Sequence, residues 1–273
     1  KALEANDNVV AMTGDGVNDA PAIKNADIGI SMGITGTDVA KDASDMILVD
    51  DNFATIVNAV EEGRVIFSNI KKFVSFLLSC NIAEVLIVFI SILLGLPSPL
   101  TPIQLLWLNL VTDAFPALAL GVEPAEPGLM EEPPRDPKES IISGEVKTNL
   151  IMQSIYITIA VLAAYIVGLK WIFPDSIEGA HTMVFATLIT SELLRAFSVR
   201  STKYTLKELG FATNPNLIKA VLLSFSLLLV VMYVPVLTEL FEVVSLTWEW
   251  IPVLILSLIP LVLGEIGKIV RRK

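Results

Sequence analysis

The chain has 273 residues, of which 53% are hydrophobic, and its formal net charge is −10. The apolar fraction exceeds the value of about 45–50% that soluble domains reach even with glycine counted, so an ordinary soluble domain is excluded. The acidic balance argues against a nucleic-acid partner. The one cysteine, Cys80, excludes an internal disulfide and is expected to be a small buried apolar side chain.

Residues 1–72 look soluble and acidic, and their most informative feature is a short glycine-rich segment, Thr13-Gly14-Asp15-Gly16-Val17-Asn18-Asp19-Ala20-Pro21. An apolar run before it predicts a strand over residues 9–12, and a helix is expected to start near residue 22. Two carboxylates, Asp15 and Asp19, at the end of a strand and between glycines suit a Mg²⁺ ion that faces a phosphate. For this pattern alone, a turn that caps a helix is the simpler alternative.

Six apolar segments after residue 73 are long enough to cross a bilayer, because about 20 residues at roughly 1.5 Å each match a hydrocarbon core of about 30 Å. The predicted spans are residues 74–94, 102–122, 149–169, 181–199, 217–236 and 250–270. Residues 95–101 are expected to join the first two spans in a tight hairpin. Residues 123–145 are rich in proline and charge, which predicts an extended connector.

Basic residues flank these spans on one side only, which predicts their orientation. That side carries Lys71, Lys72, Arg135, Lys138, Lys147, Arg200, Lys203, Lys207, Lys268, Arg271, Arg272 and Lys273. The opposite side carries only Lys170. The positive-inside rule therefore predicts that both ends of the chain and both polar loops are cytoplasmic. We expect an integral protein of the plasma membrane, with the lipid bilayer as a partner.

Six polar or acidic side chains lie inside the predicted spans, where they are costly. They are Asn81, Glu84, Asn109, Thr112, Asp113 and Glu192. A carboxylate at mid-bilayer costs roughly 2.5–3.5 kcal/mol on the gentler scales, so three of them without compensation would cost roughly 7–10 kcal/mol. Some interaction must offset that cost.

Spacing groups these side chains on two neighbouring helices. Asn81 and Glu84 are three residues apart and share one helix face. Thr112 and Asp113 follow Asn109 at helical spacing on the segment that returns across the hairpin. Oxygen ligands of this kind suit a hard cation such as Ca²⁺ or Na⁺. We interpret the pattern as an ion site, and interhelical hydrogen bonding between protonated acids is the alternative.

Two further residues are expected to shape this region. Pro116 removes a helix hydrogen bond near Thr112, which can free backbone carbonyls as additional ligands. Arg195 lies three residues after Glu192 on the same face. It can pair with that carboxylate or snorkel to the cytoplasmic boundary, and snorkelling is the favoured expectation.

Taken together, the sequence resembles the carboxyl-terminal part of P-type cation-transporting ATPases of the calcium-pump group over essentially all its residues. The segment 13–21 resembles the hinge motif of their phosphorylation domain. Residues 81–84 and 105–113 resemble the fifth and sixth transmembrane helices, and Glu192 matches a carboxylate of the eighth. Residues 133–135 resemble the connector that follows the sixth helix.

The resemblance implies a fold for each part of the chain. Residues 1–52 would be the carboxyl-terminal half of a haloacid-dehalogenase-like α/β domain with a parallel sheet. Apolar runs at 9–12, 28–32 and 46–49 agree with three strands. Residues 53–72 would be a helical stalk, and residues 73–273 an all-α bundle of six transmembrane helices.

The resemblance also implies roles for the motif residues. Asp15, Asn18 and Asp19 would be the catalytic residues, with Asp15 and Asp19 binding Mg²⁺ and Asn18 holding the same site or orienting the phosphate. Thr13, Gly14 and Gly16 would form the loop that binds the cofactor. The transported cation would be held by Asn81, Glu84, Asn109, Thr112, Asp113 and Glu192.

The implied activity is ATP-driven transport of a cation, Ca²⁺ by preference, through an aspartyl-phosphate intermediate, with Na⁺ and Mn²⁺ as alternative ions. The sequence contains no Asp-Lys-Thr-Gly-Thr acceptor and no Pro-Glu-Gly-Leu turn. ATP would therefore be bound mainly by a missing amino-terminal part of the same pump, and this chain alone is expected to be inactive. Its start at Lys1 in mid-domain favours a truncated pump over a non-catalytic membrane remnant or subunit, or a passive channel.

Overall fold

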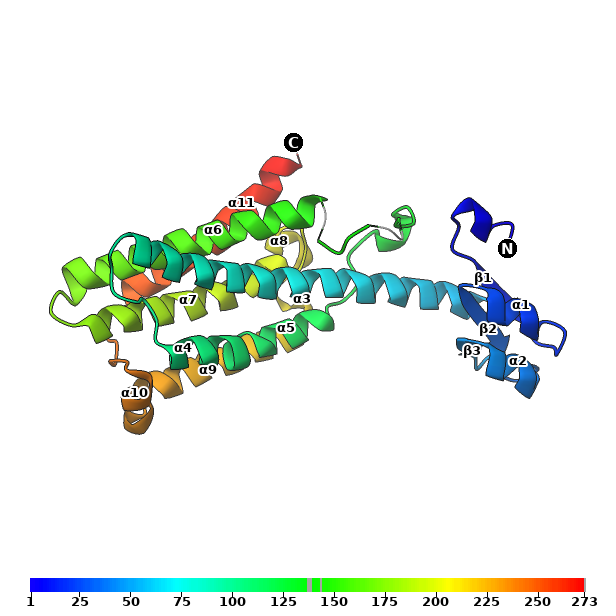
Figure 1. Cartoon of the computed structure of the whole chain (residues 1–273), viewed down its shortest axis with the longest axis horizontal. Coiled ribbons are helices and arrows are strands. Elements are labelled where there is room, and N and C mark those ends of the chain that lie inside the picture. The colour runs from blue at the N-terminus through cyan, green and yellow to red at the C-terminus, as the bar shows by residue number, and fades with distance from the viewer. Residues whose placement is uncertain (137–138, 143, 273) are drawn as a thin grey trace. The chain divides into compact units, whose positions relative to one another are not determined.

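The computed structural model describes residues 1–136, 139–142 and 144–272. Lys138 and Lys273, two of the basic residues from which the orientation of the spans is predicted, lie outside the described residues. The chain forms two compact units, Lys1–Arg64 and Val65–Lys273, and the boundary between them falls within helix α3, which runs from Ala54 to Leu93. Figure 1 labels the helices and strands.

The first unit, whose residues are all described, is built on a parallel sheet of three strands. Strands β1 (Ala11–Gly14), β2 (Ile28–Met32) and β3 (Met46–Leu48) lie in the order β1-β2-β3. A short 3₁₀ turn, η1 (Glu4–Asn6), precedes them, and helices α1 (Ala20–Asn25) and α2 (Asp38–Ala43) form the crossovers that parallel pairing requires. The predicted parallel sheet is thus confirmed.

The core of this unit is small and apolar. Ile30, Met32 and Leu48 are buried, and Ile56 at the start of α3 packs against them. The first strand lies two residues later than residues 9–12, because pairing with β2 begins where Ala11 meets Ile28. Val9 stays 61% exposed and contributes nothing to the core.

The second unit is helical. Its longer segments are α4 (Pro102–Trp107), η2 (Leu108–Thr112), α5 (Ala114–Gly121), α6 (Gly144–Val167), η4 (Gly168–Ile172), α7 (Ile177–Val199), α9 (Pro215–Tyr233), α10 (Pro235–Phe241) and α11 (Trp250–Arg271). Short turns are η3 (Leu129–Glu131), α8 (Leu206–Leu209) and η5 (Phe211–Thr213). Because η2 and η4 are π-helical, the segments that contain them continue as helices with one widened turn.

Six helical segments among the described residues are long and apolar enough to cross a membrane, which confirms the predicted number. They are Ala54–Leu93, Pro102–Gly121, Val146–Ile172, Ile177–Val199, Pro215–Tyr233 and Trp250–Arg271. The fourth of them, α7, is the innermost. In its most apolar stretch of 18 residues, 89% of the residues are buried, against 28–50% in the other five segments. It packs against α5, α6, α9 and α11 (Figure 1).

Helix α3 is fixed to the bundle by both apolar and polar contacts. Phe76 and Cys80 lie in an apolar cluster with Leu120 of α5. The hydroxyl of Ser154 on α6 donates to the carbonyl of Ser79 at 3.1 Å. The part of α3 that carries the predicted ion ligands is therefore held in one orientation against its neighbours.

A buried ion pair links the segment after α5 to the end of α7, and a hydrogen bond links it to the start of α9. Arg200, which the orientation argument counted as a loop residue, is 1% exposed and donates from Nε to Glu123 Oε1 at 2.8 Å. Its other nitrogens donate to the Gly210 carbonyl at 2.8 Å and to the Thr213 hydroxyl. Asn214 donates to the second oxygen of Glu123 at 2.5 Å. The buried charges are thus both paired and hydrogen-bonded, as burial demands.

Replacing Arg200 with methionine should destabilise the protein by about 3–5 kcal/mol, because Glu123 would stay buried without its cation. Lys203→Met is the matched control: its ion pair with Glu132 joins side chains that are 56% and 46% exposed. That pair should be worth at most about 1 kcal/mol. Thermal unfolding in detergent micelles measures both, and equal losses would contradict the assignment.

Candidate cation-binding site

The glycine-rich segment forms the end of β1, a tight loop and the start of α1. The carboxylate of Asp19 accepts hydrogen bonds from the backbone amides of Asp15 at 3.2 Å and Gly16 at 3.0 Å. It makes no side-chain cap hydrogen bond to α1. The loop therefore curls around Asp19, while the side chains of Asp15 and Asn18 are exposed and accessible to a ligand.

The neighbouring loop between β2 and α2 is also held by hydrogen bonds. The amide of Thr37 donates to the carbonyl of Asp15 at 2.8 Å. Asp51 accepts from the amides of Ile34 at 2.9 Å and Thr35 at 2.8 Å, and these bonds lower the pKa of Asp51 to about 2. Because this carboxylate stays ionised well below neutral pH, the loop beside Asp15 remains fixed across the physiological range.

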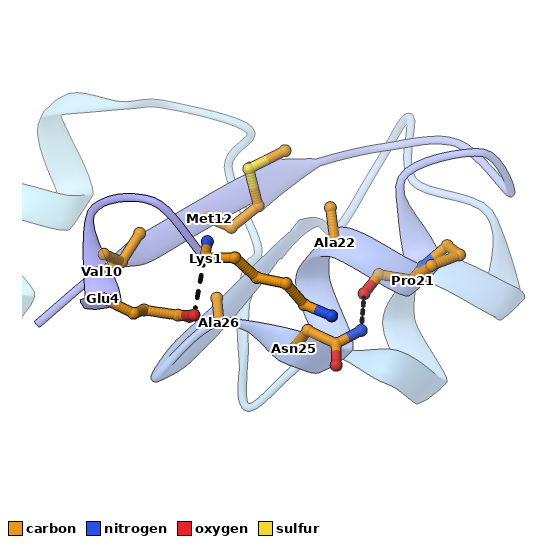
Figure 2. Close-up of a pocket in the computed structure, with 8 residues that line it drawn as sticks. All are labelled: Lys1, Glu4, Val10, Met12, Pro21, Ala22, Asn25 and Ala26. Atoms are coloured by element: carbon orange, nitrogen blue, oxygen red, sulfur yellow. Dashed lines mark hydrogen bonds and ion pairs between the residues drawn. The ribbon is translucent and has the colours of Figure 1, made fainter.

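A pocket elsewhere in the first unit lies against the amino-terminal residues. It is lined by Lys1, Glu4, Val10, Met12, Pro21, Ala22, Asn25 and Ala26 (Figure 2). In it the terminal amine pairs with Glu4 at 3.4 Å, and the Asn25 amide donates to the Pro21 carbonyl at 2.5 Å (Figure 2). None of the three predicted catalytic residues lines this pocket, so it is separate from the predicted Mg²⁺ site.

The membrane-spanning bundle contains two buried carboxylates that lack hydrogen-bond partners. Asp113, at the junction of η2 and α5, and Glu192, on α7, are each 1% exposed. None of their four oxygens accepts a hydrogen bond within the described part of the chain. One oxygen from each, together with the sulfur of Cys80, lies within 4.8 Å of the others. Three separate helical segments thus converge on one buried point.

Glu84 extends this group of acids on α3. It is 6% exposed, and its Oε2 accepts a hydrogen bond from the amide of Asn109 at 2.8 Å. Its Oε1 is buried without a partner among the described residues. The predicted contact between the helix that carries Glu84 and the segment that carries Asn109 is therefore present.

Pro116 alters the returning segment in the way its chemistry requires. Pro116 has no N–H, so the Thr112 carbonyl loses its intrahelical partner. Three residues before Pro116, the amide of Asp113 donates to the carbonyl of Leu108, five residues back, at 3.1 Å. The Thr112 carbonyl accepts instead from the Ser224 hydroxyl of α9 at 3.1 Å. The carbonyl that was expected as a spare ion ligand is thus already engaged.

Two predicted ligands are placed differently from the buried acids. Asn81 is exposed, and its amide donates to the carbonyl of Leu77 at 2.9 Å within its own helix. Thr112 is buried, with its hydroxyl donating to the carbonyl of Leu108 at 2.9 Å. Glu84, Asp113 and Glu192 are the buried acids. Asn109, like Asn81, is exposed and donates to a carbonyl one turn earlier, that of Leu105 at 3.0 Å, but it differs from Asn81 in also donating to Glu84.

Arg195 corrects one expectation. Its side chain does not snorkel: it is 1% exposed, and Nη1 donates to the Phe76 carbonyl at 3.3 Å and to Cys80 Sγ at 3.6 Å. The prediction was wrong because α7 is the innermost helix, so a side chain on it faces packed neighbours rather than a membrane boundary. When Glu84, Asp113, Glu192 and Arg195 are all charged they sum to −2, the charge that one divalent cation neutralises.

Cys80 is the site residue that sequence reasoning missed. It is fully buried, as expected of an apolar side chain, but its sulfur faces two carboxylates rather than apolar atoms alone. Spacing gave only part of the signal: Cys80 precedes Glu84 by four residues and Asn81 precedes it by three, so both lie within about one turn of the face that carries Glu84. Asn81, one position on, points about 100° away around the helix.

A buried carboxylate oxygen without a partner raises the free energy of the folded protein, and contact with a cation offsets that cost. Five such oxygens are present among the described residues, one from Glu84 and two each from Asp113 and Glu192. Oxygen-rich sites of this kind select hard cations. The arrangement is therefore suited to take up a cation inside a membrane-spanning bundle.

Comparison with known proteins agrees with this chemistry. The family model described as "Cation transporting ATPase, C-terminus" matches residues 97–270, more than half of the chain. The chain belongs to this family of cation-transporting ATPases.

Among individual proteins, the chain is similar to Calcium-transporting ATPase 1 of Bacillus cereus, at 47% identity over 100% of the chain and 32% of that protein. It is 46% identical to the Calcium-transporting ATPase of Bacillus subtilis, over 100% of the chain and 31% of that protein. It is 38% identical to the endoplasmic reticulum calcium ATPase srcA of Aspergillus fumigatus, over 99% of the chain and 31% of that protein. The predicted resemblance to the carboxyl-terminal portion of P-type calcium-transporting ATPases is confirmed, and the chain spans about a third of the length of these relatives.

The contact between Gly14 and Asp19 gives a direct test of the glycine-rich loop. A Cβ at Gly14 would lie 2.5 Å from the Cβ of Asp19, whereas one at Gly16 would lie 3.5 Å from its carboxylate. Gly14→Ala should displace Asp19 and speed hydrogen exchange at the amides of Asp15 and Gly16, as measured by NMR. Gly16→Ala is the matched control and should leave the Asp15 amide protected. Equal exchange in the two variants would exclude the proposed packing.

Proposed function

We propose that this chain supplies the cation site of an ATP-driven pump that moves Ca²⁺ across a membrane. The observation that carries the proposal is the group of three buried carboxylates, Glu84, Asp113 and Glu192, with five unpartnered oxygens among membrane-length helices. Two similar bacterial proteins and one fungal one are named calcium ATPases, which favours Ca²⁺ over Na⁺ or Mn²⁺.

The full ligand set of the proposal is the one predicted from sequence. Glu84, Asp113 and Glu192 supply charge, and Asn109 and Thr112 supply neutral oxygens. The Asn109 amide nitrogen is hydrogen-bonded to Glu84, so the side-chain oxygen of Asn109 lies next to one of the acids. Asn81 donates from its amide nitrogen to the Leu77 carbonyl, which leaves its side-chain oxygen as the atom that would contact the ion.

The first unit, in this proposal, belongs to a haloacid-dehalogenase-like phosphorylation domain over residues 1–52. Its parallel sheet and the position of Asp15 directly after β1 support the assignment. Asp15 is exposed, and Asp19 engages only one of its two oxygens with the loop amides, so both retain oxygens for Mg²⁺. When bound, Mg²⁺ would neutralise phosphate charge.

The remaining residues of the loop have positioning roles in the proposal. Asn18 is exposed beside Asp15 and would orient the phosphate. Thr13 and Gly14 end the strand, and Gly16 gives its amide to Asp19, so these three set the shape of the loop. ATP binding and the phosphorylated aspartate would belong to other regions of the complete pump, so this chain alone would not hydrolyse ATP.

Coupling between the two sites is proposed to run through α3. This helix begins at Ala54, six residues after β3 ends, and continues without a break to Leu93. The helix that carries Glu84 is therefore the one that follows the sheet directly in the chain.

With the basic residues on one side of the bundle, both ends of the chain would be cytoplasmic and the pump would lie in the plasma membrane.

Asp113→Asn and Glu192→Gln in the complete pump should each lower the apparent Ca²⁺ affinity of phosphorylation from ATP by at least about tenfold, since each removes a buried ligand charge. Glu208→Gln is the control, because Glu208 is 45% exposed and paired with Arg272. Phosphorylation that responds to Na⁺ or Mn²⁺ but not Ca²⁺ would reassign the ion. A complete protein that is never phosphorylated would favour a non-catalytic membrane subunit.

Replacing residues 61–64 of α3 with a flexible Gly-Ser linker should uncouple ATP turnover from transport while leaving Ca²⁺ binding in place. Gly63→Ala is the matched control: a Cβ at Gly63 meets nothing within 4 Å. Alanine also strengthens a helix by about 1 kcal/mol relative to glycine. Parallel assays of ATP hydrolysis and Ca²⁺ uptake in vesicles measure the coupling, and full coupling in the linker variant would refute this role of α3.

A further inference from the structure

The sulfur of Cys80 is part of the buried acid group. The residue is fully buried on α3, and its Sγ lies within 4.8 Å of one carboxylate oxygen of Asp113 and one of Glu192, which are equally close to each other. Both acids are 1% exposed, and their oxygens accept no hydrogen bond from a described residue. One thiol and two unpartnered carboxylates therefore surround the same point.

This donor set differs chemically from a site made of oxygen alone. Sulfur is a soft ligand that favours thiophilic cations such as Zn²⁺ and Cd²⁺, whereas Ca²⁺ takes oxygen ligands. Zinc sits about 2.3 Å from sulfur and about 2.0–2.2 Å from oxygen, so its tetrahedral ligands lie roughly 3.3–3.7 Å apart. Side-chain rotations that close the present separation by about an ångström would bring all three atoms onto one ion.

We propose that Cys80, Asp113 and Glu192 together bind a thiophilic divalent cation such as Cd²⁺ or Zn²⁺. The inference rests on the proposed function, because Asp113 and Glu192 are also proposed ligands of the transported ion. On binding, the S–H bond breaks, an S–metal bond forms, and the proton leaves to the solvent. The guanidinium of Arg195, whose Nη1 is 3.6 Å from the sulfur, compensates the charge of the thiolate.

Consequently, the site should accept soft ions in competition with Ca²⁺. A hard-ion site made of carboxylates and amides alone has no ligand that favours cadmium over calcium. Cys80 supplies one within 4.8 Å of an oxygen of Asp113 and an oxygen of Glu192. Cys80 is thus a specificity-determining residue of the cation site.

The test is a CdCl₂ titration of the purified chain in detergent, followed by ultraviolet sulfur-to-cadmium charge-transfer absorption. Because the sequence has 1 cysteine, any such absorption reports Cys80. We expect saturable absorption, release of protons when the ion binds, and suppression by excess Ca²⁺. Cys80→Ser should abolish the absorption and lower the ratio of Cd²⁺ to Ca²⁺ affinity by at least about tenfold.

Asp113→Asn and Glu192→Gln, which retain the cysteine, keep the test decisive if Cys80→Ser misfolds. Each should weaken both Cd²⁺ and Ca²⁺ binding. Absorption that survives in both variants, or that excess Ca²⁺ does not suppress, would show a thiol acting alone and overturn the inference.

The result separates the two proposals. Ca²⁺ binding without cadmium absorption would overturn the soft-metal site and leave the proposed function standing. Cadmium absorption that depends on Asp113, without Ca²⁺ binding, would support the soft-metal site and refute Ca²⁺ as the ion. Failure of both ions to bind would overturn both.

Discussion

Asp113 and Glu192 place four carboxylate oxygens inside an apolar helix bundle, and within the described residues none of the four accepts a hydrogen bond. Moving a carboxylate from water into such an interior costs several kcal/mol even after relaxation, unless the charge is paired. Arg195 is a buried cation next to this group, because its guanidinium contacts Cys80. In the proposed function, a bound divalent ion would neutralise the negative charge that remains when these acids ionise.

The surrounding contacts hold the segments that carry the buried acids close to one another. The widened turn at η2 and the missing N–H of Pro116 set the position of Asp113, and Ser224 satisfies the carbonyl that Pro116 leaves without a partner. Glu84 is tied to the same segment by Asn109. The innermost helix, α7, supplies Glu192 from a position where packing on every side restricts its movement. Rigid supports of this kind favour a site whose geometry is set before the ion arrives.

Much of this fold could be predicted from the sequence, because span length and the spacing of polar residues depend on local helix geometry. The six apolar helices follow from such local rules, whereas the parallel sheet was expected from the resemblance to the ATPase family. Whether Cys80 or Asn81 faces the buried acids could not be predicted in this way, because it depends on the rotation of α3 against its neighbours. Likewise, the burial of Arg195 depends on which helix is innermost, a property of the assembled bundle.

The most direct test of the cation site is a pair of structures of this protein, determined with and without saturating Ca²⁺. The account predicts a density peak in contact with carboxylate oxygens of Asp113 and Glu192, with Glu84 turned toward it. Carboxylates that remain without a bound ion at saturating Ca²⁺, or a peak that avoids both Asp113 and Glu192, would contradict it.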